Sequence, residues 1–243
     1  MITILDKQAF TMKTNLSFII ALLFGFICNA QTDNSDSEKF RIQISAVPAF
    51  AEYDFKGLNN FLKSKNLPSA KDGLQLIYAV KISDNTDNLF SAKGLFWNVL
   101  IGLQTSKNEA NGHSLEQMVT FGEISLGHRF FQKDRHTIYA QLGFGGMMYN
   151  VDIHNNSNSG SFSGALDEYG GSVNIKSKNN KYLSLATGYD WALDNEKDIL
   201  LGVHLGYRLA LGKEKWEIKG NSYDDSPKSS AKGFFLGATI TFR

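Results

Sequence analysis

Apolar and polar residues alternate with period two along most of the chain after residue 38. The clearest case is segment 199–218, because apolar side chains fill one face and small or polar ones fill the other. The first face carries Ile199, Leu201, Val203, Leu205, Tyr207, Leu209 and Leu211, and the second carries Leu200, Gly202, His204, Gly206, Arg208, Ala210 and Gly212. Successive side chains of a strand point to opposite faces, so this pattern predicts β-strands. Strands are predicted over residues 39–55, 73–83, 89–106, 115–132, 136–153, 181–193, 199–218 and 232–242.

The links between these segments alternate in length. Short polar links follow the second, fourth and sixth strands, and longer links follow the first, third, fifth and seventh. The short links are residues 84–88, 133–135 and 194–197, and the longer ones are 56–72, 107–114, 154–180 and 213–231. Such alternation over an even number of strands is typical of transmembrane barrels, with short periplasmic turns and long outer loops. We therefore predict an all-β fold, an eight-stranded antiparallel up-and-down transmembrane β-barrel.

Two segments depart from the simple alternation. The link 56–72 places Leu58, Phe61, Leu62 and Leu67 at helical spacing, which predicts a short amphipathic helix at the membrane surface. The fourth strand is less regular near Val119 and Phe121. We expect a β-bulge to shift its register there.

The composition of the non-apolar face indicates which face meets lipid. In a soluble, lipocalin-like barrel the non-apolar face would be the outer one, and it would carry many Lys, Glu, Thr and Gln side chains. Here the non-apolar face is instead rich in glycine, and the chain has 22 glycines. Glycine suits the narrow interior of an eight-stranded barrel. The apolar faces avoid the cost of about 2–4 kcal/mol for a Lys or Arg at the bilayer midplane. We predict that Leu201, Val203 and Leu205 face lipid. Phe40, Phe130, Trp191 and Phe242 are expected to form the periplasmic aromatic girdle.

The first 30 residues read as a targeting segment. Lys13 precedes an apolar run over residues 16–27, and Cys28-Asn29-Ala30 follows it. This order predicts a secretory signal peptide cut after Ala30, because the run is too short for a membrane-spanning helix. Met12 is expected to be the natural start, with residues 1–11 upstream of it. The predicted domains are then the signal peptide 1–30, a polar leader 31–38 and the barrel 39–243.

The C-terminal segment carries a recognisable pattern. Phe234, Leu236, Ala238, Ile240 and Phe242 alternate with small residues up to the penultimate position, and Arg243 follows. With the signal peptide and eight strands, this segment resembles small outer-membrane β-barrel proteins of the OmpA/OmpX type. The resemblance implies insertion into a Gram-negative outer membrane, contact with its lipid, and reading of these five residues by the barrel-assembly machinery.

Several charged residues are predicted to face the lumen. They are Arg41, Lys81, Glu123, Arg129, Asp190, His204 and Arg208, with Gln43, Gln75, Asn98 and Gln141 among them. Isolated buried charges are costly, so Glu123 and Asp190 are expected to pair with some of Arg41, Lys81, Arg129 and Arg208. The main interpretation is a filled, structural lumen, and the alternative is an ion path gated by exchange of partners.

Function is left open by these patterns. The formal net charge of +1 gives no basic stripe for a nucleic acid. The five histidines do not begin the His-x-Ser pattern of lipid A deacylases, so we predict no enzyme, no cofactor and no metal site. The leading hypothesis is a structural or surface-interaction protein that binds an unidentified ligand or protein through its outer loops. The alternatives are a narrow passive pore and, third, a lipid-modifying enzyme.

Overall fold

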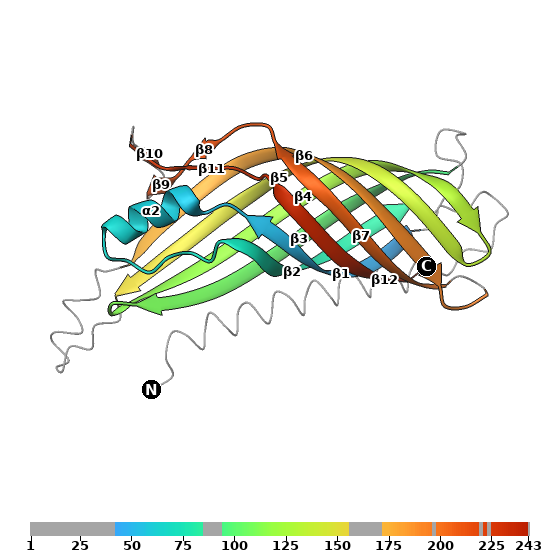
Figure 1. The fold of residues 1–243 in the computed structure, drawn as a ribbon, viewed down its shortest axis with the longest axis horizontal. Coiled ribbons are helices and arrows are strands. Elements are labelled where there is room, and N and C mark those ends of the chain that lie inside the picture. The colour runs from blue at the N-terminus through green and yellow to red at the C-terminus, as the bar shows by residue number, and fades with distance from the viewer. Residues whose placement is uncertain are drawn as a thin grey trace. The chain divides into compact units, whose positions relative to one another are not determined.

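Eight long strands close into one antiparallel barrel (Figure 1). The computed structural model describes residues 42–84, 94–155, 172–195, 198–218, 221–222 and 225–242. The wall strands are β1 (Ile42–Tyr53), β2 (Gly73–Asp84), β3 (Leu95–Ala110), β4 (His113–Lys133), β5 (His136–Asn155), β6 (Val173–Ala192), β7 (Ile199–Ala210) and β12 (Gly233–Phe242). Each pairs with the next along this series, and β12 pairs with β1. The predicted fold class is therefore confirmed.

One end of the barrel carries additional short elements. Helix α2 (Lys56–Ser64) follows β1, and four two-residue strands lie between β7 and β12 (Figure 1). These strands are β8 (Glu214–Lys215), β9 (Glu217–Ile218), β10 (Asn221–Ser222) and β11 (Lys228–Ser229). The C-terminal residues of β12 lie at the opposite end (Figure 1). We call the two ends the α2 end and the C-terminal end.

Several predicted boundaries differ from the structure. The predicted loop 107–114 is wrong, because β3 and β4 continue into it and meet at a tight turn of Asn111 and Gly112. Both turn residues have positive φ, 54° and 76°, which is the conformation of two-residue hairpin turns. Strand β6 begins at Val173 rather than at residue 181, and β7 ends at Ala210 rather than at 218. The signal peptide, the leader, Phe40 and Arg41 lie outside the described residues.

The predicted bulge near Val119 and Phe121 is also wrong. Register between β4 and β5 is continuous from His113 to Arg129, and it shifts only between Arg129 and Phe131. Val119 and Phe121 both point inward and are buried, as alternation from Glu123 requires. Elsewhere on the strand the apolar side chains point outward. Val119 and Phe121 differ because the interior of the barrel becomes apolar toward the α2 end.

Candidate functional site

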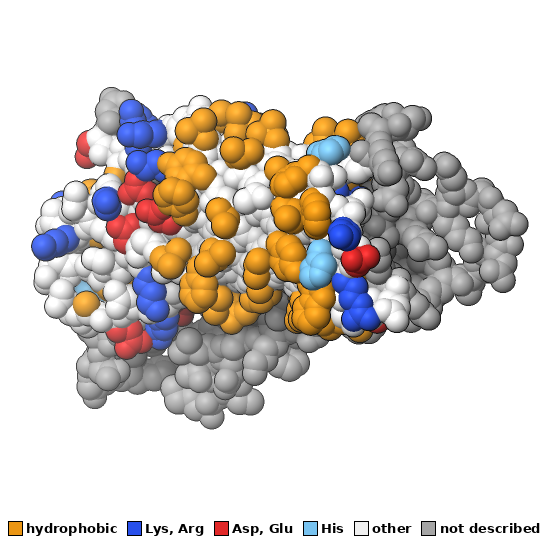
Figure 2. Space-filling view, turned by 45° about the vertical axis from the view of Figure 1, so that its right-hand side comes forward, with side chains coloured by type: hydrophobic (Ala, Val, Ile, Leu, Met, Phe, Trp, Pro, Cys, Tyr) orange, Lys and Arg blue, Asp and Glu red, His pale blue; other side chains and the backbone are white. Residues whose placement is uncertain are grey.

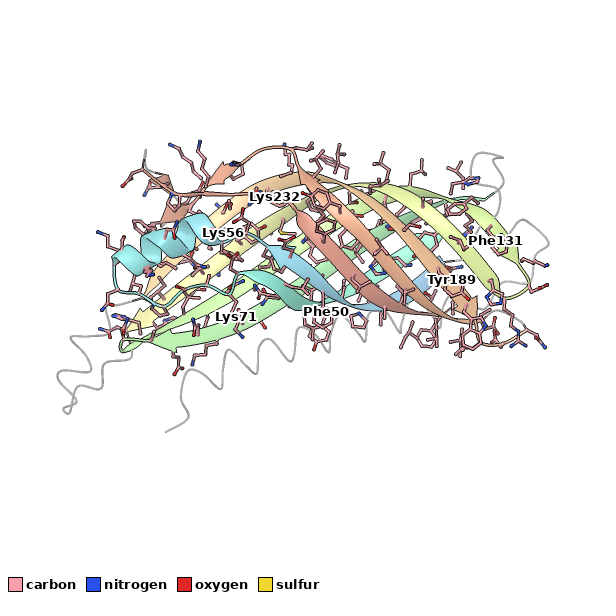
Figure 3. All side chains as sticks on the ribbon, viewed as in Figure 1. Phe50, Lys56, Lys71, Phe131, Tyr189 and Lys232 are labelled. Carbon is pink, nitrogen blue, oxygen red and sulfur yellow. The ribbon has the colours of Figure 1, made fainter. Side chains whose placement is uncertain are left out.

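The outer face of the barrel carries a continuous apolar band. On β7, Leu201, Val203 and Leu205 are exposed, while Gly202 and His204 are buried. Figure 2 shows hydrophobic side chains across the middle of the visible face, with charged side chains on both sides of them. In Figure 3, Lys56, Lys71 and Lys232 lie toward the α2 end, Phe131 and Tyr189 lie toward the other, and Phe50 lies between. The band is the surface that a barrel presents to lipid.

The polarity of the wall reverses toward the α2 end. On β5, the outward residues change from Leu142 and Phe144 to Asn150 and Asp152, and the inward residues change from glycines to Val151 and Ile153. The inward Val151 and Ile153 are 0% and 4% exposed. The same change occurs on β3, where the outward Ile101 and Leu103 are followed by Thr105, Lys107 and Glu109. This part of the wall therefore has the pattern of a water-soluble barrel. We call it, with α2 and β8–β11, the head.

An aromatic cluster forms the core of the head. Trp216 stacks on Tyr149 at 5.8 Å between ring centroids, and Phe55 packs edge-on against Tyr149 at 5.0 Å. Tyr53 contacts both Phe55 and Tyr149. All four rings are at most 2% exposed. The cluster covers the lumen at the α2 end because its rings come from β1, the residue before α2, β5 and the segment between β7 and β12.

Helix α2 packs against this core, and its position corrects the predicted one. Leu58 and Leu62 are 1% and 0% exposed within the hydrophobic core of the head. The predicted helix is present, but its apolar face covers the lumen instead of the membrane surface. Asn59 fixes the chain after the helix by donating to the Ala70 carbonyl at 2.9 Å and accepting from the Ala70 amide at 2.8 Å.

The outer surface of the head is an ordered polar sheet. Asn174 on β6 donates to Asn150 and Asp152 on β5, and Asn150 also donates to Asp152 at 2.8 Å. Lys178 lies 3.7 Å from Glu217. On the β3–β4 hairpin, Lys107 lies 2.8 Å from Glu109, whose carboxylate raises the pKa of the Lys107 ammonium. Rotamers held by hydrogen bonds lose less entropy on binding, so such a surface is suited to recognition.

In the middle of the lumen lie three of the predicted residues, Glu123, His204 and Arg208. They are 4%, 9% and 3% exposed. Arg208 donates to the Glu52 carbonyl at 2.9 Å, and its guanidinium lies 5.4 Å from the ring centre of Tyr53. No ion pair within 4.0 Å joins Glu123 to Arg208, so they interact electrostatically at longer range. Arg208 is stabilised mainly by a carbonyl and aromatic rings.

Closer to the C-terminal end lie Lys81, Arg129 and Asp190. Lys81 interacts electrostatically with both Asp190 and Arg129, and its ammonium lies 5.9 Å from the ring centre of Tyr139. The Arg129 guanidinium lies 4.8 Å from the ring centre of Phe96. The structure thus brings one carboxylate together with two cations and two rings. These cations and rings share the lumen at this level of the barrel.

The lumen is closely packed around Glu123, His204 and Arg208. A cavity lined by these three residues has a volume of about 20 Å³, which is room for about one water molecule. Inward glycines permit this packing, since large side chains from neighbouring strands lie directly over them. For example, a Cβ atom on Gly143 would overlap Glu123 and Ser184, and one on Gly237 would overlap His204.

The sequence pattern did not identify the residues that close the lumen. Trp216 falls in a segment predicted as strand and loop, and the inward Tyr149 interrupts an otherwise glycine-rich face. The sequence carried one sign that the interior becomes apolar toward the α2 end: on the inward face of β5, Tyr149 is followed by Val151 and Ile153 instead of by glycines. Among the described residues, no group of three or more His, Cys, Asp or Glu could hold a metal ion. No described helix is long and apolar enough to cross a membrane.

The closed barrel with an apolar outer band defines a class, the small eight-stranded outer-membrane β-barrel. A major outer membrane protein of Thermus thermophilus is similar, with 12% identity and a TM-score of 0.50 over 83% of this chain and 98% of that one. Neisserial surface protein A has 12% identity and a TM-score of 0.45 over 83% and 94%. Ail, the attachment invasion locus protein of Yersinia pestis, has 13% identity and a TM-score of 0.35 over 83% and 96%. At these identities the likeness concerns the fold. No protein-family model and no curated protein matches the chain.

Proposed function

We propose that this protein is a non-conducting outer-membrane barrel whose head lies outside the cell and binds a macromolecular partner. The observation that carries the proposal is the reversal of wall polarity, because it builds a rigid polar platform beyond the apolar band. The packed core under α2 keeps that platform in one conformation. Strands that extend beyond the apolar band are not needed to anchor a barrel in the membrane, so they support a role for the head outside it.

The proposal includes a route to the membrane. Cleavage after Ala30 would release the mature chain from its signal peptide. Phe234, Leu236, Ala238, Ile240 and Phe242 would then be read by the barrel-assembly machinery. The outward positions of Phe234, Leu236 and Phe242, which are 63%, 54% and 51% exposed, support such a role.

The filled lumen argues against the pore alternative. An ion passing along the axis would have to displace the aromatic cluster of the head and the layer of Lys81, Arg129 and Tyr139. The structural interpretation of the predicted lumen residues is therefore the one we propose. Arg208, Glu123 and His204 would hold the centre of the barrel and take no part in conduction.

Photocrosslinking in living cells tests the proposal. A photoreactive phenylalanine analogue replaces Lys176 in the head or Leu185 in the apolar band, both exposed on the outer face of β6. We expect position 176 to give a discrete adduct with a protein or glycan, and position 185 to give only lipid adducts. Both variants must reach the outer membrane and shift in mobility on boiling. The proposal fails if position 176 gives no discrete adduct, or if both positions give the same one.

A further inference from the structure

A groove crosses the apolar outer surface of the barrel over β5, β6, β7 and β12. Its volume is about 200 Å³. An apolar cavity of about 150 Å³ binds benzene, so this groove has room for a segment of one hydrocarbon chain. The large side chains that line it all occupy outward positions of their strands, and they are Ile138, Tyr189, Val203, Leu205 and Leu236.

The groove exists because small residues interrupt the apolar band. Thr187 lies on the outer face of β6 between the larger Leu185 and Tyr189. The Thr187 hydroxyl donates to the Tyr139 carbonyl on β5 at 2.9 Å, so this hydroxyl is already satisfied by the wall. Directly across from Thr187 on β5 is Ala140, which is also small. The wall is therefore thinnest at these two residues, and a chain can lie close to the strands there.

The groove extends toward a polar rim at the C-terminal end. Tyr189, which lies toward that end in Figure 3, lines the groove, and its hydroxyl lies 2.6 Å from Nδ1 of His136. The two rings stack with 5.9 Å between their centroids, and His136 is exposed. With the Tyr189 hydroxyl as donor to Nδ1, the imidazole Nε2 carries the ring proton and can donate it to a phosphate oxygen.

The turns at this rim carry charges of both signs. Arg135, in the β4–β5 turn, donates to the Leu193 carbonyl at 3.3 Å and to the Asn195 side chain, which holds this cation over the turn that follows β6. The charged residues of the two turns, as far as the structure describes them, are Lys133, Asp134, Arg135, Asp194 and Asp198. A zwitterionic headgroup finds partners for both its charges here, whereas an anionic one meets three carboxylates that repel it.

We propose that the groove and this rim together bind one molecule of a zwitterionic phospholipid. Part of one acyl chain lies over Thr187, and the lipid phosphate accepts from Nε2 of His136. Lipid and protein are equally apolar in a membrane, so contacts that an empty groove would forfeit decide which molecule stays. The site lies at the opposite end of the barrel from the head and is independent of what the head binds.

Native mass spectrometry of the protein released from lipid vesicles counts the bound lipid. The vesicles contain equal amounts of phosphatidylethanolamine, which is zwitterionic, and anionic phosphatidylglycerol with the same acyl chains. We expect one phospholipid to be retained at saturation, with phosphatidylethanolamine in about fivefold excess, an effect of the size that one exposed ion pair produces. Absence of a saturable adduct would overturn the site. Equal retention of the two lipids, or an excess of phosphatidylglycerol, would overturn the headgroup assignment.

Variants of Thr187 locate the acyl chain. Thr187→Leu fills the groove and is expected to abolish retention, whereas Thr187→Val keeps the volume, removes only the hydroxyl and retains the lipid. Thr120→Leu, the same change at an outward position of β4, is the matched control and leaves retention unchanged. Each variant must shift in mobility on boiling, and if Thr187→Leu fails to fold, Val203→Phe fills the groove from β7 with the same expected loss. Retention by the filled variant, or an equal loss in Thr120→Leu, would overturn the placement in the groove.

His136→Phe tests the headgroup contact. The substituted ring still stacks on Tyr189 but has no nitrogen to donate, so we expect retention of phosphatidylethanolamine to fall about fivefold, the usual effect of losing one hydrogen bond. Unchanged retention would remove His136 from the site.

Discussion

Replacing Trp216 by alanine is expected to lower the free energy of unfolding by about 3–5 kcal/mol, the usual cost of truncating a buried aromatic residue. Trp216 is 2% exposed and packs against both Tyr149 and Phe55. Its loss leaves a cavity under α2, because rings from separate strands cannot collapse into the space. Urea titration of the folded protein in micelles, read from gel mobility without boiling, measures the effect.

The control for this variant is Trp191→Ala. Trp191 is 42% exposed on the outer face of β6, so its truncation creates no internal cavity. We expect a clearly smaller loss of stability than for Trp216→Ala. Equal losses would contradict the description of the head as a packed core that is continuous with the barrel.

The second large effect is expected at Gly143, on the inner face of β5. A Cβ atom there would overlap the Glu123 carboxylate and the Ser184 hydroxyl. Gly143→Val should therefore lower the free energy of unfolding by about 1–3 kcal/mol, the usual cost of overpacking. The same urea titration measures it.

Gly146, three residues along the same strand, provides a matched control. Apart from Gly146 and its two chain neighbours, no atom lies within 4 Å of the position that a Cβ would occupy there. Gly146→Val adds apolar surface without a clash, and valine favours strands, so stability is expected to stay the same or to rise slightly. A Gly143→Val protein as stable as Gly146→Val would show that the lumen is not filled as described.

The architecture could be predicted because strand alternation depends only on neighbours in the sequence. Leu201, Val203 and Leu205 share a face whatever the rest of the chain does, and eight such segments suffice to close a barrel. The extent of the strands could not be read in the same way. Around Val119 and Val151 the apolar face turns inward, and a change of environment produces the same pattern as a change of register.

The residues that close the lumen depend on contacts between distant parts of the chain. Trp216 meets Tyr149 and Phe55 only after β1, β5 and the segment before β12 are brought together. The predicted lumen residues were easier to place, since an inward position on a membrane strand follows from alternation. Their partners were not, because Arg208 is held by a backbone carbonyl and aromatic rings.

The orientation of the two faces of β7 is the central claim, and oxygen accessibility measures it directly. Spin labels are attached one at a time to cysteines placed at positions 201, 203, 205 and 207 of the protein in lipid vesicles, with the natural Cys28 replaced by serine. The even positions are left unlabelled because side chains added at Gly202 or Gly206 would overlap their neighbours. We predict high accessibility to dissolved oxygen and low accessibility to a water-soluble relaxation agent at all four positions. Low accessibility to oxygen at these positions, or high accessibility to the water-soluble agent, would contradict the account.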